Sequence, residues 1–389
     1  MEKRMINVAL VGAGWAGAMH ATAYNRVCGV PVRRKTVCAL EPTLPEFAEQ
    51  YGFEEYTDDF SKVLQDEEID VVDIVTPPNL HESMVIAALQ AGKHVICEKP
   101  LTGYFGMPED EPPIGQVPKT KMLKAVQKTC GKIEEALAQS GKKFFYAENW
   151  VYAPAFVRAV ELILKKGTTV LQISGVIGHK GSHADYVRYW RKSGGGTLAR
   201  NLIHPLTAAV YLKKKELEAK GKNYGVKSLV CDCSMVTKDA EKRYILADPA
   251  DVEDWSHMVL TFNDGSKAIL TATDIYLGEM VNSLSIYGND AVLKCNFTPN
   301  NLLNVYFSDE QGIESELIME KSDHNIGHQS ALVADDFLRG YFSEIQDFME
   351  CIYYDRQPQC GFELAKEAIE LIYQGYCASE MEEYNSRNV

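Results

Sequence analysis

The sequence predicts an α/β domain with a doubly wound parallel sheet, followed by an α+β domain with an open-faced, mainly antiparallel sheet. Three observations predict this fold class. Strand and helix patterns alternate over the first part of the chain, a glycine-rich turn directly follows the first apolar run, and hairpin-linked strand patterns take over later. Because 389 residues exceed one ordinary core, we expect two domains, 1–148 and 149–389.

The strands expected in the first domain are near-continuous apolar runs, which is typical of parallel strands buried on both faces. They lie at 5–11, 35–41, 70–75, 93–97 and 143–147. Helix patterns fill the intervals, at 15–27, 44–51, 59–66, 80–91 and about 120–140. This βαβ alternation predicts one parallel sheet with helices on both faces.

The second domain changes to strand patterns joined by short turns. A helix is expected at 154–166, and the strand-like runs lie at 169–178, 226–236, 256–263, 266–276, 282–287 and 291–297. The tripeptide Asn263-Asp264-Gly265 is a strong hairpin signal between two of these runs. Two amphipathic helices, about 335–355 and 363–380, are expected to close the chain.

Composition limits the partners. A net charge of −14 argues against nucleic acid and against anionic membrane surfaces, since both require a basic face. No run of about twenty apolar residues predicts a membrane span, and the N-terminus lacks a signal-peptide layout. The ten cysteines are expected to be free thiols in a reducing cytoplasm. Cys231 and Cys233 are expected on opposite faces of a strand, so neither a metal nor a redox site is expected there.

The motif Gly12-x-Gly14-x-x-Gly17 follows the first strand and opens a helix near Trp15 and Ala16. In such a turn the first glycine makes the bend, the second lets the backbone approach a pyrophosphate, and the third allows close helix–strand packing. The free N–H groups at the helix start favour phosphate. The context favours dinucleotide binding over an ordinary tight turn.

The next strand is predicted to end at Glu41. A carboxylate there can accept hydrogen bonds from the adenosine ribose and would repel a 2′-phosphate, so we expect NAD rather than NADP. The loop Thr76-Pro77-Pro78-Asn79-Leu80-His81 follows a later strand, and its prolines suit contact with a flat ring. Thr76, Pro77 and Asn79 are therefore expected at the cofactor, whereas His81 either touches the cofactor or caps the next helix.

Lys99 follows Glu98 at the end of the 93–97 strand, where open α/β sheets bind their ligands. It is either an ammonium that stabilises charge on a substrate oxygen or the partner of Glu98 in a rim ion pair. Lys99 could also accept the proton if burial lowered its pKa. His204 is the better candidate, although a histidine in such apolar surroundings is often a core residue. The Pro- and Gly-rich segment 102–119 fits no regular element; it is either a flap over this cleft or a surface excursion or subunit contact.

Residues 179–191, HKGSHADYVRYWR, crowd aromatic and basic side chains into one loop. Such side chains suit a sugar or polyol site, although an amphipathic surface segment explains them equally well. His179 and His183 have the spacing of a helical metal pair, but the intervening glycine argues against a helix, and no metal is expected.

Together these residues resemble the Gfo/Idh/MocA oxidoreductase family, over nearly the whole chain. The motifs that carry the resemblance are VGAGWAG, TPPNLH, CEKPL, Ala147-Glu148-Asn149-Trp150-Val151-Tyr152-Ala153-Pro154, Val252-Glu253-Asp254-Trp255, Phe262-Asn263-Asp264-Gly265 and Ile286-Tyr287-Gly288. The resemblance implies a Rossmann domain, an open-faced sheet domain that builds homodimers or homotetramers, and NAD(P)-dependent oxidation of a ring hydroxyl of a sugar or cyclitol.

The resemblance also implies residue roles. Lys99 becomes the catalytic lysine and His204 the active-site histidine, with Glu98 beside the cofactor and Asn149 near its nicotinamide end. The candidates for the substrate pocket are Trp150, Tyr152, His183, Tyr186, Trp190 and Arg200.

Position 200 departs from the family pattern. The family commonly has an aspartate one helical turn before the histidine, and this chain has Arg200. A guanidinium cannot orient the imidazole and would lower its pKa. Either the proton route differs, or Arg200 binds a substrate carboxylate or extra hydroxyls.

We therefore expect an NAD-dependent dehydrogenase acting on a ring hydroxyl of a sugar, glycoside or cyclitol. Two alternatives remain open on the sequence. One is a redox-neutral enzyme that recycles bound NAD during glycoside cleavage or elimination through a keto-sugar. The other is a non-catalytic regulator that senses NAD or a sugar.

Overall fold

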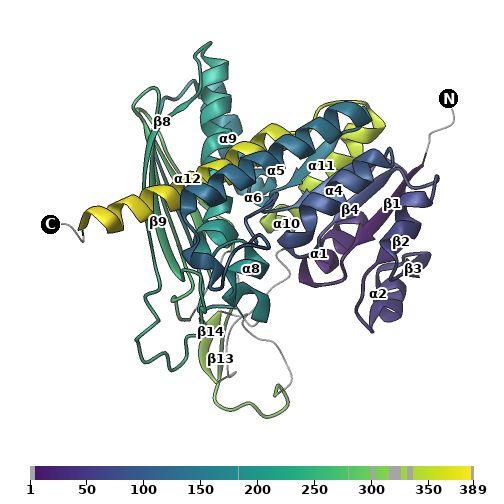
Figure 1. Ribbon diagram of the computed structural model, residues 1–389, viewed down its shortest axis with the longest axis horizontal. Helices are drawn as coiled ribbons and strands as arrows, with labels where there is room; N and C mark the ends of the chain where they lie inside the picture. The colour runs from purple at the N-terminus through teal and green to yellow at the C-terminus, as the bar shows by residue number, and fades with distance from the viewer. Residues whose placement is uncertain are drawn as a thin grey trace.

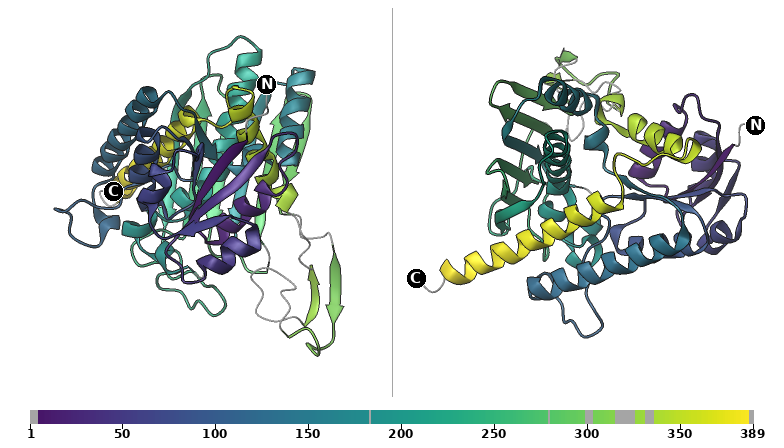
Figure 2. Two further views of the ribbon diagram at one scale, coloured as in Figure 1. Left: turned by 90° about the vertical axis from the view of Figure 1, so that its right-hand side faces the viewer. Right: turned by 90° about the horizontal axis from the view of Figure 1, so that it is seen from above.

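The computed structural model describes residues 5–182, 184–278, 280–298, 303–314, 326–330 and 336–386. Two sheets lie next to each other, and the long helices α5 (Lys119–Ser140) and α12 (Phe362–Ser386) run side by side along them (Figures 1 and 2). The apolar core is largely continuous across both halves of the chain.

The first sheet has six parallel strands in the described chain, in the order β3-β2-β1-β4-β5-β6. Their bounds are β1 (Ile6–Val11), β2 (Val32–Cys38), β3 (Glu55–Thr57), β4 (Val71–Ile74), β5 (His94–Glu98) and β6 (Phe144–Ala147). The strand order reverses between β1 and β4, and ligands of such sheets bind beyond the carboxyl ends of the strands at that point. The doubly wound parallel sheet is confirmed.

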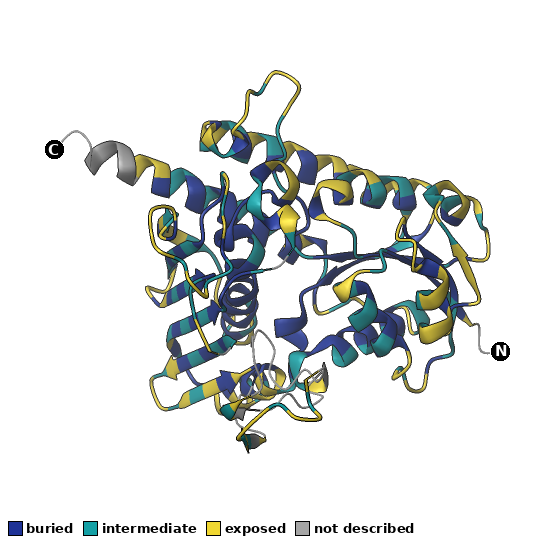
Figure 3. Ribbon diagram, turned by 90° about the horizontal axis from the view of Figure 1, so that it is seen from below, coloured by how far each residue is buried: buried dark blue, intermediate teal, exposed yellow. Residues whose placement is uncertain are grey.

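Helices cover the faces of this sheet: α1 (Trp15–Tyr24), α2 (Leu44–Tyr51), α3 (Phe60–Gln65), α4 (His81–Gln90) and α5. Figure 3 shows that the strands are mostly buried, while the helices keep exposed outer faces. The predicted strand 35–41 is wrong by three residues, because β2 begins at Val32. Its first residues are charged, and Arg33 and Lys35 are tolerated there because acidic side chains pair with them. The three-residue edge strand β3 was not predicted.

The second sheet has the order β12-β11-β7-β10-β9-β8. Its strands are β7 (Val170–Gly178), β8 (Val226–Ser234), β9 (Trp255–Phe262), β10 (Lys267–Thr273), β11 (Val281–Gly288) and β12 (Val292–Asn296). Only β7 and β10 pair in parallel within the described sheet, so the mainly antiparallel prediction is confirmed. The hairpin at Asn263-Asp264-Gly265 is also confirmed: Gly265 has φ +87° and its N–H donates to the Phe262 carbonyl at 2.9 Å.

One face of this sheet is covered and the other is open. Burial alternates strictly along β9, with every second residue buried. Helix α9 (Ile203–Ala219) packs on the covered face against β7, and α7 (Pro154–Lys166) packs on α9 and β12. Helix α7 has exactly its predicted bounds, but α9 was not predicted. Its first half is buried all round, so it lacks an amphipathic pattern, and Pro205 near its start reads as a helix breaker.

The remaining elements are short or lie near the C-terminus. They are α6 (Asn149–Tyr152), α8 (Trp190–Ser193), β13 (Asn304–Phe307), β14 (Gly327–Ser330), α10 (Asp336–Arg339) and α11 (Tyr341–Tyr353). Helix α11 returns to pack on α1 and β1, while α12 contacts α5, β8 and α9. The last helices therefore belong to both halves, and the division at residue 148 stays a prediction. No helix among the described residues combines the length and apolar character needed to cross a bilayer.

The segment 102–119 contains one short helical turn, Ile114–Gln116, and contacts the second half of the chain. The Tyr104 N–H donates to the Tyr373 hydroxyl at 2.6 Å, and the Gly115 N–H donates to Asp251 at 3.1 Å. Ile114 is buried, whereas most of 107–113 is exposed. The segment is thus anchored at both ends, with an exposed tip between them.

The expectation for the cysteine pair on β8 is wrong. The Sγ atoms of Cys231 and Cys233 lie 3.6 Å apart, on the same face of the strand. Residues two apart on a strand share a face, because successive side chains alternate. Both thiols are free.

Candidate active site

The glycine-rich turn lies at the strand-order reversal and has the shape that a dinucleotide needs. Gly12 has φ +116°, and a Cβ built on it would come within 2.8 Å of the Val75 carbonyl oxygen, so only glycine fits. A Cβ on Gly14 would meet nothing within 4 Å, so this side of the turn faces open space. No side chain caps the start of α1, which leaves its first N–H groups available for phosphate. The turn therefore fits a pyrophosphate.

The predicted cofactor residues around this turn are accessible. Trp15 is 58% exposed and meets Tyr341 edge-on. Glu41 is exposed beyond the end of β2. Pro77 and Asn79 are exposed after β4, and Ala16 and Thr76 are partly exposed. These positions follow the carboxyl ends of β1, β2 and β4, which lie at one edge of the parallel sheet.

His81 has a different place from either of its predicted ones. Its Nδ1 lies 2.9 Å from the Pro100 carbonyl oxygen and its Nε2 lies 2.9 Å from the Thr76 carbonyl oxygen. The ring is fully buried, and burial lowers its pKa. The neutral ring carries one N–H, so His81 donates to one of these carbonyls and lies against the other, between the loop after β4 and the turn after Lys99.

Lys99 lies at the end of β5 and reaches across to the second half of the chain. Its ammonium donates to the Arg200 carbonyl at 2.9 Å, while its N–H donates to a Glu98 carboxylate oxygen at 2.8 Å. Burial lowers the pKa of Lys99, against the opposing charges of Glu98 and Glu148. The predicted rim pair with Glu98 is thus a main-chain contact, and the ammonium itself points toward the residues that precede His204.

His204 lies in the first turn of α9 and is almost fully buried. Its Nδ1 is 2.6 Å from Oε1 of Glu148, a fully buried residue that directly follows β6. The Trp150 ring stacks parallel to the imidazole, with centroids 5.8 Å apart and 17° between planes. Glu148 thus lies against His204 and also acts electrostatically on Lys99. Glu148 contacts His204 directly, while the ammonium of Lys99 is bound to the main chain four residues before His204.

Arg200 does not face His204. Its guanidinium donates to Asp274 at 2.5 Å, and this carboxylate raises the pKa of Arg200 although burial opposes it. Residues Leu198–Leu202 form a π-helical turn, so Arg200 and His204 are not one α-helical turn apart. The like-charge contact expected from the sequence is therefore replaced by an ion pair with Asp274.

Comparison with known proteins identifies the family. Residues 6–108 match "Oxidoreductase family, NAD-binding Rossmann fold", and residues 172–384 match "Oxidoreductase family, C-terminal alpha/beta domain". The chain belongs to the Gfo/Idh/MocA oxidoreductase family. The expected resemblance is confirmed, and residues 6–108 of this Gfo/Idh/MocA chain match the family's NAD-binding Rossmann domain.

Curated relatives match over part of their length. A levoglucosan dehydrogenase of Pseudarthrobacter phenanthrenivorans is 43% identical over 104 residues, which is 25% of this chain and 26% of that protein. A scyllo-inositol 2-dehydrogenase (NAD(+)) of Bacillus subtilis is 38% identical over 103 residues, 26% of this chain and 29% of that protein. The match thus spans less than a third of these relatives.

Solved structures share the whole fold. GenD2 from gentamicin A biosynthesis, in complex with NAD, has a TM-score of 0.76 at 20% identity and covers 97% of this chain and 95% of its own. Levoglucosan dehydrogenase in complex with NADH and L-sorbose has a TM-score of 0.73 at 20% identity, with 97% and 98% covered. At this identity the likeness establishes the Gfo/Idh/MocA fold.

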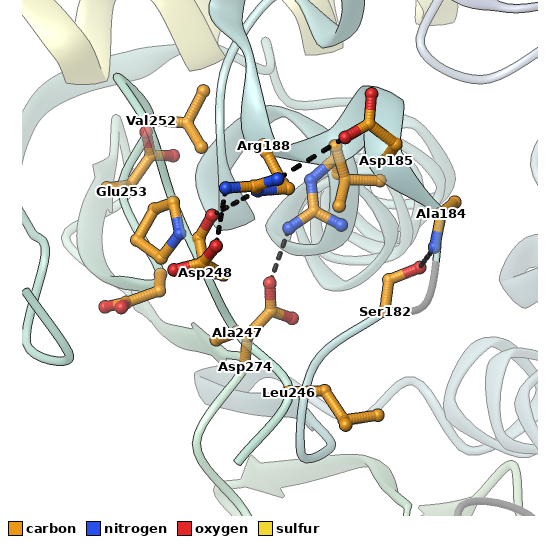
Figure 4. Close-up of a pocket in the computed structure, with 14 residues that line it drawn as sticks. Ser182, Ala184, Asp185, Arg188, Leu246, Ala247, Asp248, Val252, Glu253 and Asp274 are labelled. Atoms are coloured by element: carbon orange, nitrogen blue, oxygen red, sulfur yellow. Dashed lines mark hydrogen bonds and ion pairs between the residues drawn. The ribbon is translucent and has the colours of Figure 1, made fainter. Parts of the chain in front are cut away.

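A cavity of about 280 Å³ lies beside Arg200 in this Gfo/Idh/MocA chain. Arg200 is paired with Asp274 in the lining of this cavity. Figure 4 shows Asp274 and, apart from it, Arg188 paired with Asp185 and Asp248. The Nε atom of Arg200 is buried and has no hydrogen-bond partner among the described residues. Carboxylates outnumber guanidinium groups in this lining, so the cavity disfavours an anionic ligand.

The other predicted substrate residues divide into two groups. Tyr186, on the short turn Asp185–Arg188 beside the cavity, is 38% exposed. Trp150 backs the imidazole of His204. Tyr152 and Trp190 were predicted to line the substrate pocket, but both lie in the core. The Tyr152 hydroxyl donates to Asp347 at 2.8 Å, and the Trp190 ring packs against Tyr376 with centroids 4.7 Å apart.

Two predicted residues require separate mention. Asn149 is buried, and its Nδ2 donates to the Arg339 carbonyl at 2.7 Å, so its contact with a nicotinamide stays a prediction. His183 lies outside the described residues.

The sequence prediction missed a buried polar cluster beneath the glycine turn. His20 donates to Asp73 at 2.9 Å and lies 3.5 Å from Glu98 and 3.9 Å from Glu344. Burial lowers the pKa of His20, but the neighbouring carboxylates outweigh it and raise this pKa well above its usual range. The one available signal was Asp73 inside an otherwise apolar strand, since a buried carboxylate requires a partner.

Proposed function

We propose that this protein oxidises a ring hydroxyl of a sugar, glycoside or cyclitol and passes the hydride to NAD. Two contacts carry the proposal: Lys99 binds the main chain four residues before His204, and Glu148 binds the imidazole of His204. The open glycine turn of the same sheet supports it. The names of the relatives, a levoglucosan dehydrogenase and a scyllo-inositol 2-dehydrogenase, support the substrate class.

Each residue has a defined task in this reaction. Lys99 donates a hydrogen bond to the reacting oxygen and stabilises the charge that develops there. His204 takes the hydroxyl proton on Nε2, because Nδ1 is turned to Glu148. When bound, NAD supplies the ring that accepts the hydride. Trp150 fixes the imidazole plane, and Tyr186 and Arg200 contact the rest of the substrate beside the cavity.

NAD is preferred over NADP in this proposal because Glu41 is exposed at the end of β2, next to the glycine turn. Its carboxylate accepts hydrogen bonds from ribose hydroxyls and repels a 2′-phosphate. A reducing, cytoplasmic compartment suits the ten cysteines, all of which are free.

The test incubates purified protein with NAD and a panel of cyclitols, hexoses and glycosides. Growth of NADH absorbance with a ring-hydroxyl substrate supports the proposal. An altered substrate without net NADH would instead identify a redox-neutral enzyme. Thermal stabilisation by a sugar without any chemistry would identify a sensor.

We also propose that the open sheet face pairs with a second copy of this chain. In register across β11, β7, β10, β9 and β8, the row Ser285, Ser174, Ile269, Val259 and Val230 carries no charge, and Val230 is 53% exposed. Light scattering should report a dimer or tetramer. Ile269→Asp should give the monomer mass, whereas Lys165→Glu on α7 should not; a monomeric wild type would end this proposal.

A further inference from the structure

Glu148 occupies an unusual position for an acid. It directly follows β6, the strand next to β5, whose end carries Glu98 and Lys99. Its side chain is completely buried. Its Oε1 accepts hydrogen bonds from Nδ1 of His204 at 2.6 Å and from the main-chain N–H of Trp150 at 3.3 Å. Its Oε2 is buried and has no hydrogen-bond partner within the described parts of the chain.

A buried acid of this kind lowers the stability of the folded state. Burying a carboxylate costs several kcal/mol unless it is paired, and an unpartnered oxygen adds to that cost. Helix α6, which Glu148 caps, has only four residues and does not require a charged cap. The burial of Glu148 is therefore explained by its contact with the imidazole of His204.

The contact with His204 defines which ring nitrogen serves the reaction. A carboxylate accepts only, so Nδ1 must carry the hydrogen between the two groups. Nε2 is then unprotonated in the neutral ring and is able to accept a proton. The stacked Trp150 ring keeps the imidazole in this plane. Residue 200 cannot do this, because Arg200 is bound to Asp274.

We propose that Glu148 is the positioning residue of this site: it fixes the tautomer of His204 and is the counter-charge of its imidazolium. This inference rests on the proposed function. As the substrate O–H bond breaks, a bond forms between that proton and Nε2, while the carbinol C–H pair leaves as hydride to NAD. The carbon–oxygen bond becomes a carbonyl, and the resulting imidazolium is stabilised by the neighbouring carboxylate of Glu148.

The kinetic test compares Glu148→Gln, Glu148→Asp and Glu216→Gln. Glu216 is an equally buried acid that is bound to Lys213, far along α9, so it controls for the loss of a buried charge. Glu148→Gln should lower kcat by about 10²- to 10⁴-fold with KM for NAD nearly unchanged. Its pH–rate limb for the base should move to lower pH, because the imidazolium loses its counter-charge. Glu148→Asp should recover part of kcat.

A second measurement does not depend on turnover. Nitrogen-15 NMR of histidine-labelled protein, assigned by the signal lost in His204→Gln, reports the His204 tautomer directly. The Nδ1–H form is expected in wild type, with the Nε2–H form gaining in Glu148→Gln. An Nε2–H wild type, or an unchanged kcat and pH limb in Glu148→Gln, overturns the proposal. If no substrate is found but the tautomer is as expected, the proposed function fails and the Glu148 inference stands.

Discussion

The Nζ atom of Lys99 donates a hydrogen bond to the main-chain oxygen of Arg200, 2.9 Å away. This carbonyl belongs to the π-helical turn Leu198–Leu202, and Pro205, five residues on, has no N–H to give it. The lysine thus supplies this carbonyl with a donor that Pro205 cannot provide. One contact places the ammonium and joins the two halves of the molecule.

Replacing this ammonium should strongly lower kcat and leave the affinity for NAD unchanged. We expect Lys99→Met to reduce kcat by about 10²- to 10⁴-fold, because a methyl thioether cannot donate to the reacting oxygen. NADH formation measures the rate, and cofactor titration measures binding. Lys165→Met, at an exposed position of α7, is the matched control. A kcat within about twofold of wild type would contradict the hydrogen bond from Lys99 to the reacting oxygen.

The carboxylate of Glu41 should determine the preference for NAD over NADP. The wild-type protein is expected to use NAD in preference to NADP. Glu41→Ala should raise KM for NAD about tenfold or more, because one or two hydrogen bonds to a charged acceptor are lost. The nearby exposed Glu46, changed in the same way, should leave KM unaltered. Equal use of NAD and NADP by wild type would contradict the assignment.

Two glycine substitutions should separate cofactor binding from stability. A methyl group at Gly14 meets no protein atom, so Gly14→Ala should fold normally yet bind NAD at least about tenfold more weakly. Gly131 lies inside α5 with equal space around it, and Gly131→Ala should raise stability by about 0.5–1 kcal/mol. Thermal melts and NAD titration of both variants provide the check. Unchanged NAD affinity in Gly14→Ala would contradict the placement of the NAD pyrophosphate at this turn.

Stability should fall as pH rises, because of Glu344. Burial raises the pKa of Glu344 well above its usual range. The stability that its bound proton contributes is complete below the unfolded-state pKa and is lost as pH rises through the folded-state pKa. Glu344→Gln, which mimics the protonated acid, should flatten the fall in Tm that begins above about pH 4.3, the unfolded-state pKa of a glutamate. The exposed Glu218, changed to Gln, should leave the slope alone.

Parallel Tm–pH curves for wild type and Glu344→Gln would contradict this reasoning. His20 contributes in the same direction, because its pKa is also raised in the folded protein. Some slope should therefore persist in Glu344→Gln. That residual slope should disappear when His20 is changed to Asn as well.

Much of the fold could be predicted because it depends on local patterns. The buried strands of the first sheet are apolar runs, and α7 is strongly amphipathic between Pro154 and Gly167. Helix α9 escaped prediction because tertiary burial on all sides removes the periodicity that reveals a helix. The shift of β2 arose because charged residues such as Arg33 are accommodated only through partners distant in sequence.

The site divides in the same way. Lys99 and the glycine turn were predictable because both directly follow apolar strand patterns in the sequence. Sheets of this kind bind their ligands at the strand ends. The partner of His204 was not, because Glu148 is 56 residues away in sequence and only folding brings it to the imidazole. Arg200 was misjudged because α-helical spacing was assumed where the backbone makes a wider π turn.

The return of α11 and α12 to the first sheet has a practical consequence. A fragment that ends near residue 148 would leave bare the apolar surface that α11 covers on α1 and β1. Such a truncated cofactor module should aggregate when expressed by itself. Transplanting this module into another protein would require grafting the terminal helices along with it.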